Sequence, residues 1–241
     1  MEENPIKIIS SDGTGQGLTV LNVDGESNLK NVYFENLRNP SKEEWEVTGA
    51  ITFYNSPVKL DNIEISGMKA EDSLNIMNSK FEVRNSFFKD CLFDCLDVDF
   101  GEGVIESTSF TDCGNDCVDI SGANVTLKEI KIINARDKGI SLGEKGDIVG
   151  EGIQINKGYI GIASKDLSIA EIKGLEISNC EYGLAIYQKK SEFGSAKLRA
   201  FEINFSSNKN DYIVEKKSDL SLNGKIIMGN KEKIFEELYP L

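Results

Sequence analysis

The chain has 241 residues, of which 27 are Lys or Arg and 40 are Asp or Glu, and it contains no His. The net charge of −13 argues against a nucleic-acid or anionic-membrane partner, because like charges repel. Without His, any enzymatic proton transfer must use Asp, Glu, Lys, Arg, Tyr or Cys, and the commonest transition-metal ligand is missing.

The N-terminal part contains short apolar pieces separated by turn residues. Residues 1–9 lack the basic and apolar regions of a signal peptide, and no apolar run in the chain approaches the roughly 20 residues of a membrane span. The polar segment 38–47 holds the only Trp and is predicted to be a loop inserted into an early repeat. We expect a single domain over residues 1–241.

A repeat of 22 residues governs the segment 71–190. Apolar residues recur at this interval at Leu74, Leu96, Val118, Ile140, Ile162 and Leu184. Two more apolar columns run parallel to it, at Ile65, Phe88, Phe110, Ile132, Ile155 and Ile177, and at Leu60, Val83, Ile105 and Leu127. Short β-branched or aromatic strands between Gly, Asn, Asp and Ser turns, without a helical period, predict an all-β, single-stranded, right-handed parallel β-helix. We expect about eight to nine coils, regular over 27–220.

The C-terminal segment 229–241 is predicted to cap the rod. Ile234, Phe235 and Leu238 have helical spacing, and a short helix there would cover the open end, where unpaired strands otherwise invite edge pairing.

Four of the five cysteines lie one repeat apart, because Cys91 precedes Cys113 and Cys95 precedes Cys117 by 22 residues. A disulfide between coils is sterically conceivable, since stacked strands are about 4.8 Å apart. The interpretation we favour is two ladders of reduced thiols, which fits the odd count. A zinc site is not favoured, because there is no His and no C-x₂-C spacing.

Alternation along the strands places polar residues outside each coil. If Leu96 and Val98 point inward, then Asp97, Asp99 and Asp119 point outward and lie close together. The same columns continue at Ser141, Gly143, Ala163, Lys165, Ala185 and Tyr187. We call the three aspartates together with these residues the outward strip. Neighbouring carboxylates suit Ca²⁺, so we expect a calcium site at the three aspartates. The alternative is that these acids simply solvate the surface.

A further polar column stands at the strand entrances, at Asp72, Asp94, Asp116 and Lys138. Asp is common at such positions because it bonds its own backbone in turns. Alternatively, Asp137 and Lys138 form a buried ion pair with Asp116 that orients the outward strip.

These strands resemble those of the pectin-lyase-like superfamily of right-handed β-helices, which includes polysaccharide lyases and polygalacturonases. The resemblance is closer to bacterial β-helix domains that accompany CotH-kinase or lamin-tail modules in secreted proteins. It rests on residues 94–100, 115–122, 137–141, 164–168 and 187–190. It implies an extracellular or cell-surface location, and neighbouring domains of a longer chain as partners. Polygalacturonases place a His near their acids, and this chain has none.

Two functions follow from these patterns. The first is a module of a larger extracellular protein that binds carbohydrate, or serves as an adhesive or structural rod, through the outward strip. The second is a Ca²⁺-dependent lyase that cleaves an acidic polysaccharide by β-elimination, as lyases of the superfamily do with a Lys or Arg base. The residues expected to act in catalysis are Lys165, Tyr187 and Lys189. The residues expected to contact substrate are Asn75, Ser141, Lys138 and Lys190. Because Lys165 is two coils from Asp119, about 10 Å, a sugar would have to bridge the two.

Overall fold

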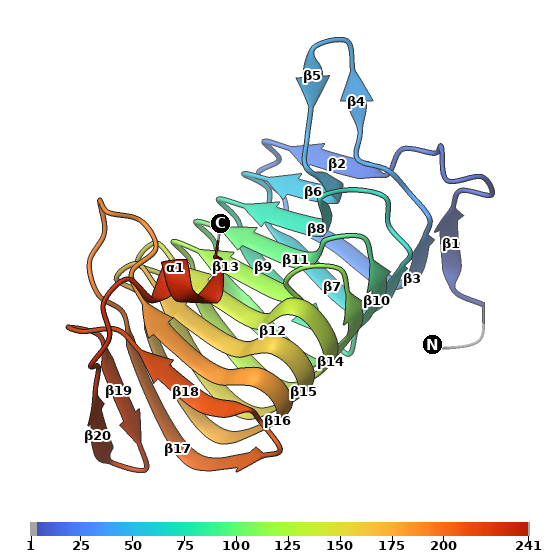
Figure 1. Ribbon diagram of the computed structural model, residues 1–241. Coiled ribbons are helices and arrows are strands. Elements are labelled where there is room, and N and C mark those ends of the chain that lie inside the picture. Colours follow the sequence, from blue (N-terminus) through green and yellow to red (C-terminus); the bar gives the residue numbers. More distant parts are fainter. Residues whose placement is uncertain (1–3, 241) are drawn as a thin grey trace.

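Parallel strands stacked in register wind around one elongated core in the computed structural model, which describes residues 4–240 (Figure 1). The all-β solenoid predicted from the repeat is confirmed, with about ten turns instead of eight or nine. The extra turn comes from the N-terminal strands. They pair in parallel with later coils, although their spacing is longer than the regular repeat of 22 residues. The register partners Val32 and Ile63, for example, lie 31 residues apart in the sequence.

One face of the solenoid carries the outward strip. Its strands are β2 (Leu18–Leu21), β6 (Gly49–Tyr54), β8 (Asp72–Met77), β11 (Asp94–Asp99), β13 (Val118–Ser121) and β18 (Asn210–Val214). Three long strands bend from the other faces into this one: β14 (Asn124–Gly143), β15 (Asp147–Lys165) and β16 (Ile169–Tyr187).

The remaining strands form the other faces. They are β1 (Ile6–Ile9), β3 (Ser27–Glu35), β7 (Val58–Ser66), β9 (Lys80–Arg84), β10 (Phe87–Cys91), β12 (Glu102–Cys113), β17 (Lys197–Ser206) and β19 (Asp219–Leu222). The insertion in an early coil folds as a hairpin of β4 (Ser41–Lys42) and β5 (Trp45–Glu46), which projects from the solenoid at the top of Figure 1.

The core consists of the predicted apolar columns. Leu74, Leu96 and Val118 are successive register partners, and all are fully buried. In the second column, the rings of Phe88 and Phe110 stack with their centroids 4.8 Å apart. Inward side chains therefore repeat at the strand spacing, and this continuity is what fixes the outward side chains in columns.

The C-terminal end departs from the prediction. The helix α1 (Ile234–Leu238) is present, but it does not cap the end of the rod. It packs on the side of the solenoid, against Ile160 and Ala185 of the outward face, as the red helix in Figure 1 shows. The last coil is instead followed by β20 (Lys225–Met228), which pairs antiparallel with β19 and thereby interrupts the parallel stacking. No helix among residues 4–240 is long and apolar enough to cross a membrane.

Candidate functional site

The outward strip exists as the alternation predicts. Asn75, Asp97, Asp119 and Ser141 are consecutive register partners on β8, β11, β13 and β14. Beside them, Met77, Asp99 and Ser121 form a second column, followed by Gly143, Lys165 and Tyr187. The predicted gathering of Asp97, Asp99 and Asp119 on one face is thus confirmed.

Three acids on or beside the outward strip, Asp72, Asp94 and Asp97, have raised pKa values because they are partly desolvated. Burial, together with the charges of Asp72, Asp99 and Asp119, raises the pKa of Asp97 to about 9. Burial likewise raises the pKa values of Asp72 and Asp94 to about 6. The side-chain amide of Asn75 donates a hydrogen bond of 3.0 Å to Asp97 Oδ2. Asn75, one of the predicted contact residues, therefore orients the carboxyl of Asp97.

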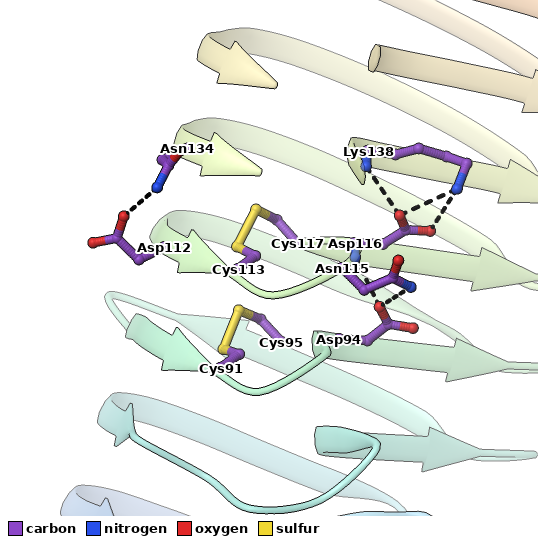
Figure 2. The surroundings of a disulfide bond; sticks show 10 residues. All are labelled: Cys91, Asp94, Cys95, Asp112, Cys113, Asn115, Asp116, Cys117, Asn134 and Lys138. Carbon is purple, nitrogen blue, oxygen red and sulfur yellow. Dashed lines mark hydrogen bonds and ion pairs between the residues drawn. A yellow bond between two sulfur atoms is a disulfide. The ribbon is translucent and has the colours of Figure 1, made fainter. Parts of the chain in front are cut away.

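The strand entrances hold a network that stacks from one coil to the next (Figure 2). Asp94 accepts hydrogen bonds of 2.7 Å from the backbone N–H of Asp116 and from the side chain of Asn115. Asp116 in turn accepts from the backbone N–H of Lys138, and its oxygens lie 3.2 and 3.3 Å from Lys138 Nζ. Lys138 Nζ also contacts Asp137, so the predicted buried ion pair is confirmed. Burial opposes the charge of Lys138, but the two aspartates outweigh it and raise its pKa.

The four cysteines next to this network are not free thiols. Cys91 is joined to Cys95 and Cys113 to Cys117, each pair within its own coil (Figure 2). The favoured prediction of reduced ladders is wrong, and the disulfides do not link coils either. The turn between β10 and β11 brings the α-carbons of Cys91 and Cys95 to 5.4 Å, which is ordinary disulfide geometry. Cys180 is the remaining cysteine, and it is free and buried.

Lys165 lies much closer to the acids than its position two coils away suggested. Its ammonium is 3.9 Å from Asp119 Oδ1 and donates to Ser141 Oγ at 2.9 Å. The long side chain reaches across Gly143, where a Cβ would stand 3.1 Å from Lys165 Nζ. Lys165 and Ser141 are both buried, so no sugar is needed to bridge Lys165 and Asp119.

The C-terminal segment packs on the part of the outward strip where two predicted catalytic residues lie, and it buries Tyr187 but leaves Lys189 exposed. Tyr187 faces outward but is 0% exposed, because Phe235 of α1 stacks near its ring. Burial raises the pKa of Tyr187, and its hydroxyl has no hydrogen-bond partner among the described residues. Lys189 lies with its ammonium 5.6 Å from the Phe235 ring centroid, and partial desolvation with the charges of Lys165 and Lys138 lowers its pKa. The expectation that Tyr187 acts in catalysis therefore does not fit its burial.

Two further predicted contact residues are also engaged within the protein. The ring of Tyr239 lies 5.5 Å from the ammonium of Lys138, and its hydroxyl donates to Asp137 at 2.7 Å. Lys190 forms an ion pair with Glu144 and remains half-buried. Both lysines therefore serve internal contacts in this structure.

The part of the outward strip on β8, β11 and β13 is called the open half below. It ends at a cleft that the sequence did not predict. Trp45 on the β4–β5 hairpin and Tyr54 on β6 line a cleft of about 370 Å³. Thr52 and Asn75 contribute polar atoms, and Met77 continues into the column of Asp99. Trp45 and Tyr54 are 44% and 40% exposed. The unique Trp within an inserted segment was the signal that could have pointed to this cleft.

A cation site at the three aspartates meets only part of the requirements for binding. Asp119 Oδ1 is buried and accepts no hydrogen bond, so one oxygen is available. Over the described range 4–240, however, no three His, Cys, Asp or Glu side chains are grouped so that they could hold a metal ion. Calcium at Asp97, Asp99 and Asp119 stays a prediction.

Comparison with known proteins agrees with the fold. Residues 74–231 match the family model described as right handed beta helix region. The chain belongs to this family. Nothing among the curated proteins matches the sequence of this β-helix.

Several solved structures share the fold at low identity. A variant of the catalytic domain of a GH87 alpha-1,3-glucanase in complex with tetrasaccharides has a TM-score of 0.49 at 11% identity, covering 91% of this chain and 56% of that one. Pantoea stewartii WceF, a glycan biofilm modifying enzyme with a tailspike-like fold, has a TM-score of 0.43 at 10% identity, covering 97% and 35%. Bacteriophage CBA120 tailspike protein 2 has a TM-score of 0.40 at 14% identity, covering 86% and 48%. This chain spans about half of those chains or less, and the likeness concerns the fold alone.

Proposed function

We propose that this β-helix binds carbohydrate in the open half of the outward strip, between the β4–β5 hairpin and the C-terminal segment. The observation that carries the proposal is the cleft of about 370 Å³ lined by Trp45 and Tyr54. Sugar rings have an apolar C–H face and a polar rim, and an aromatic cleft with a few convergent polar groups matches both. Thr52 and Asn75 lie where they can bond hydroxyl groups.

The exposed aromatics favour binding over a purely structural or adhesive rod. Trp45 stands on a hairpin that adds nothing to the stacking of the coils, since β4 and β5 pair only with each other. Trp45 and Tyr54 expose large aromatic side chains to one cleft, and a ligand that covers them would remove this apolar surface from water.

We further propose that the chain is a module of a larger bacterial extracellular protein of the kind that carries CotH-kinase or lamin-tail modules. The two disulfides support an oxidising location outside the cytosol, because cytosolic thiols are kept reduced. Neighbouring domains of that longer chain would then be its partners.

The test uses the only Trp in the sequence as a reporter. Titration of the protein with a panel of neutral and charged polysaccharides should change the fluorescence of Trp45 in a saturable way. Tyr54→Ala should weaken binding about tenfold, since stacking of one ring is worth about 1–1.5 kcal/mol. Tyr212→Ala, an exposed tyrosine on β18, serves as the matched control and should bind normally. Absence of any fluorescence or calorimetric response across the panel would refute the proposal.

A second candidate is a Ca²⁺-dependent lyase that acts on an acidic glycan by β-elimination. It is favoured by the proximity of Lys165 to Asp119, whose Oδ1 lacks a hydrogen bond. In this hypothesis Asp97, Asp99 and Asp119 hold the cation, which would screen the carboxylate of the sugar. Lys165, in its uncharged amine form, would take the proton next to that carboxylate, and the ammonium groups of Lys189 and Lys190 would stabilise the resulting negative charge. The bond between the β-carbon and the glycosidic oxygen would then break as the double bond forms, and the leaving oxygen would take up a proton.

The lyase hypothesis has a direct assay. Unsaturated uronates absorb in the ultraviolet, so an absorbance increase with acidic polysaccharides and Ca²⁺ should appear, and Lys165→Ala should abolish it. Activity retained in Lys165→Ala would remove this residue from the mechanism. No absorbance change with any acidic polysaccharide would leave binding as the function.

A further inference from the structure

About half of the acidic side chains on the other faces of the solenoid form ion pairs with neighbouring bases. Glu82 lies within 4.0 Å of both Lys59 and Arg84, and Glu64 pairs with Lys89. Similar pairs continue on the far coils, at Lys173 and Glu202, Lys197 and Asp219, Arg199 and Glu171, and Lys209 and Glu181. These faces therefore carry ladders of paired charges, interspersed with acids that form no ion pair.

The open half of the outward strip differs. Asp72, Asp94, Asp97 and Asp99 take part in none of the ion pairs found among the described residues, although they lie on adjacent strands. Lys165 and Lys190 are already paired with Asp119 and Glu144, whereas Lys189, which is exposed beside the C-terminal segment, forms no ion pair among the described residues. The floor next to the aromatic cleft thus carries carboxyl groups with no basic partner.

The wall of the cleft has the same sign. Glu43, Glu44 and Glu46 are exposed on the β4–β5 hairpin, and none of them forms an ion pair within residues 4–240. Glu46 lines the cleft together with Trp45 and accepts a hydrogen bond from Asn39. A ligand in this cleft would therefore meet carboxyl groups on its floor and on its wall.

We infer that the glycan bound in this cleft carries free amino groups, as in a polymer of hexosamine that has lost its N-acetyl groups. The inference rests on the proposed function, since it names the class of sugar for the same site. An ammonium group offers three hydrogen-bond donors and a compact positive charge, which would favour the ionised form of these carboxyl groups, including Asp97, whose pKa is about 9 without a ligand. A uronate would instead bring negative charge toward these acids, and Lys189, which forms no ion pair among residues 4–240, lies at the other end of the strip beside Phe235.

The geometry of the strip suits a polymer of this kind. Asn75, Asp97 and Asp119 are repeated at the strand spacing of about 4.8 Å, which is close to the length of one pyranose residue. A chain running along the solenoid axis from Trp45 would therefore pass one coil for each sugar. Each sugar beyond the cleft would meet an acidic coil.

The test compares oligosaccharides that differ only in charge. The intact chain is titrated, with Trp45 fluorescence and calorimetry, against β-1,4-glucosamine and α-1,4-galactosamine hexamers, each in its free-amine and its N-acetylated form. Hexagalacturonate with and without Ca²⁺ completes the set. At low salt, a free-amine hexamer should bind at least about tenfold more tightly than its acetylated counterpart, and added salt should reduce this difference.

The possible results separate this inference from the proposed function. Equal binding of amine and acetylated forms would overturn the inference and leave glycan binding intact. Tighter binding of the uronate, with Ca²⁺ present, would overturn it in favour of the lyase hypothesis. Failure of every hexamer would refute both.

Isosteric variants assign the effect to particular carboxyl groups. Asp97→Asn and Asp99→Asn should each weaken binding of the free-amine hexamer about fivefold and leave the acetylated hexamer unchanged. Asp147→Asn, an exposed acid at the start of β15 on another face, is the matched control. Tyr54→Ala should weaken both hexamers alike. If the two outward-strip variants behave like the control, the carboxyl groups do not select the ligand.

Discussion

Replacing Lys138 by Met should destabilise the protein in a strongly pH-dependent way. Lys138→Met keeps most of the volume of the side chain but leaves Asp116 buried without its cation. Burial raises the pKa of Asp116 to about 7 even while Lys138 lowers it, so the variant must have a still higher value. The unfolded chain has an Asp pKa near 3.9, and each pKa unit corresponds to about 1.4 kcal/mol.

The sign follows from proton binding. In the variant, the folded form holds a proton on Asp116 that the unfolded chain has already lost, so stability falls as pH rises from about 4 to above 7. Because Asp116 of the unmodified chain itself titrates near pH 7, the loss relative to that chain should be small at pH 5 and about 1.4 kcal/mol at pH 8, and it should grow further as the pH rises toward the pKa of the variant. Urea unfolding followed by circular dichroism at the two pH values measures it.

The double variant Lys138→Met/Asp116→Asn is the control, because it removes both charges. It should recover most of the stability at pH 8, since no unpaired charge remains. Equal losses at pH 5 and pH 8 for the single variant would refute the reasoning, and so would a double variant that is no more stable than the single one.

Three further predictions concern the surroundings of the site. Reduction of the Cys113–Cys117 disulfide should cost about 2 kcal/mol by the loop-entropy relation for a short loop; an unchanged melting temperature under reductant would contradict it. Tyr239→Phe removes a hydrogen bond to Asp137 and should lower the free energy of hydrogen-exchange protection in the C-terminal segment by about 1.5–3 kcal/mol. Unchanged protection in this variant would contradict the prediction. Phe88→Ala deletes a fully buried, stacked ring and should cost about 3–5 kcal/mol in urea unfolding, whereas a loss below 1 kcal/mol would mean that the coil collapses around the gap.

The fold was accessible from the sequence because a solenoid repeats its packing. Once Leu96 and Val98 are placed inward, strand geometry alone puts Asp97 and Asp99 outside, and the register partners confirm it. The first turns were undercounted because their spacing is irregular, as the insertion of the β4–β5 hairpin shows.

Contacts that depend on long side chains or on distant segments were not accessible in the same way. The reach of Lys165 across Gly143 depends on a rotamer that no spacing rule reveals. The burial of Tyr187 depends on Phe235, which lies almost 50 residues later in the sequence. The pairing of Cys91 with Cys95 depends on the path of one turn, which the 22-residue interval does not specify.

The C-terminal segment changes how the end of the solenoid can come apart. Coils of a solenoid normally contact only their neighbours, so the terminal coil can open without its predecessors. Here one short segment touches β14 through Asp137, β15 through Tyr159, β16 through Tyr187 and β18 through Ile213. It thereby connects four successive coils by direct contacts. The C-terminal coils should therefore open as one cooperative unit when this segment detaches. The N-terminal coils, which no such segment connects among residues 4–240, should open singly.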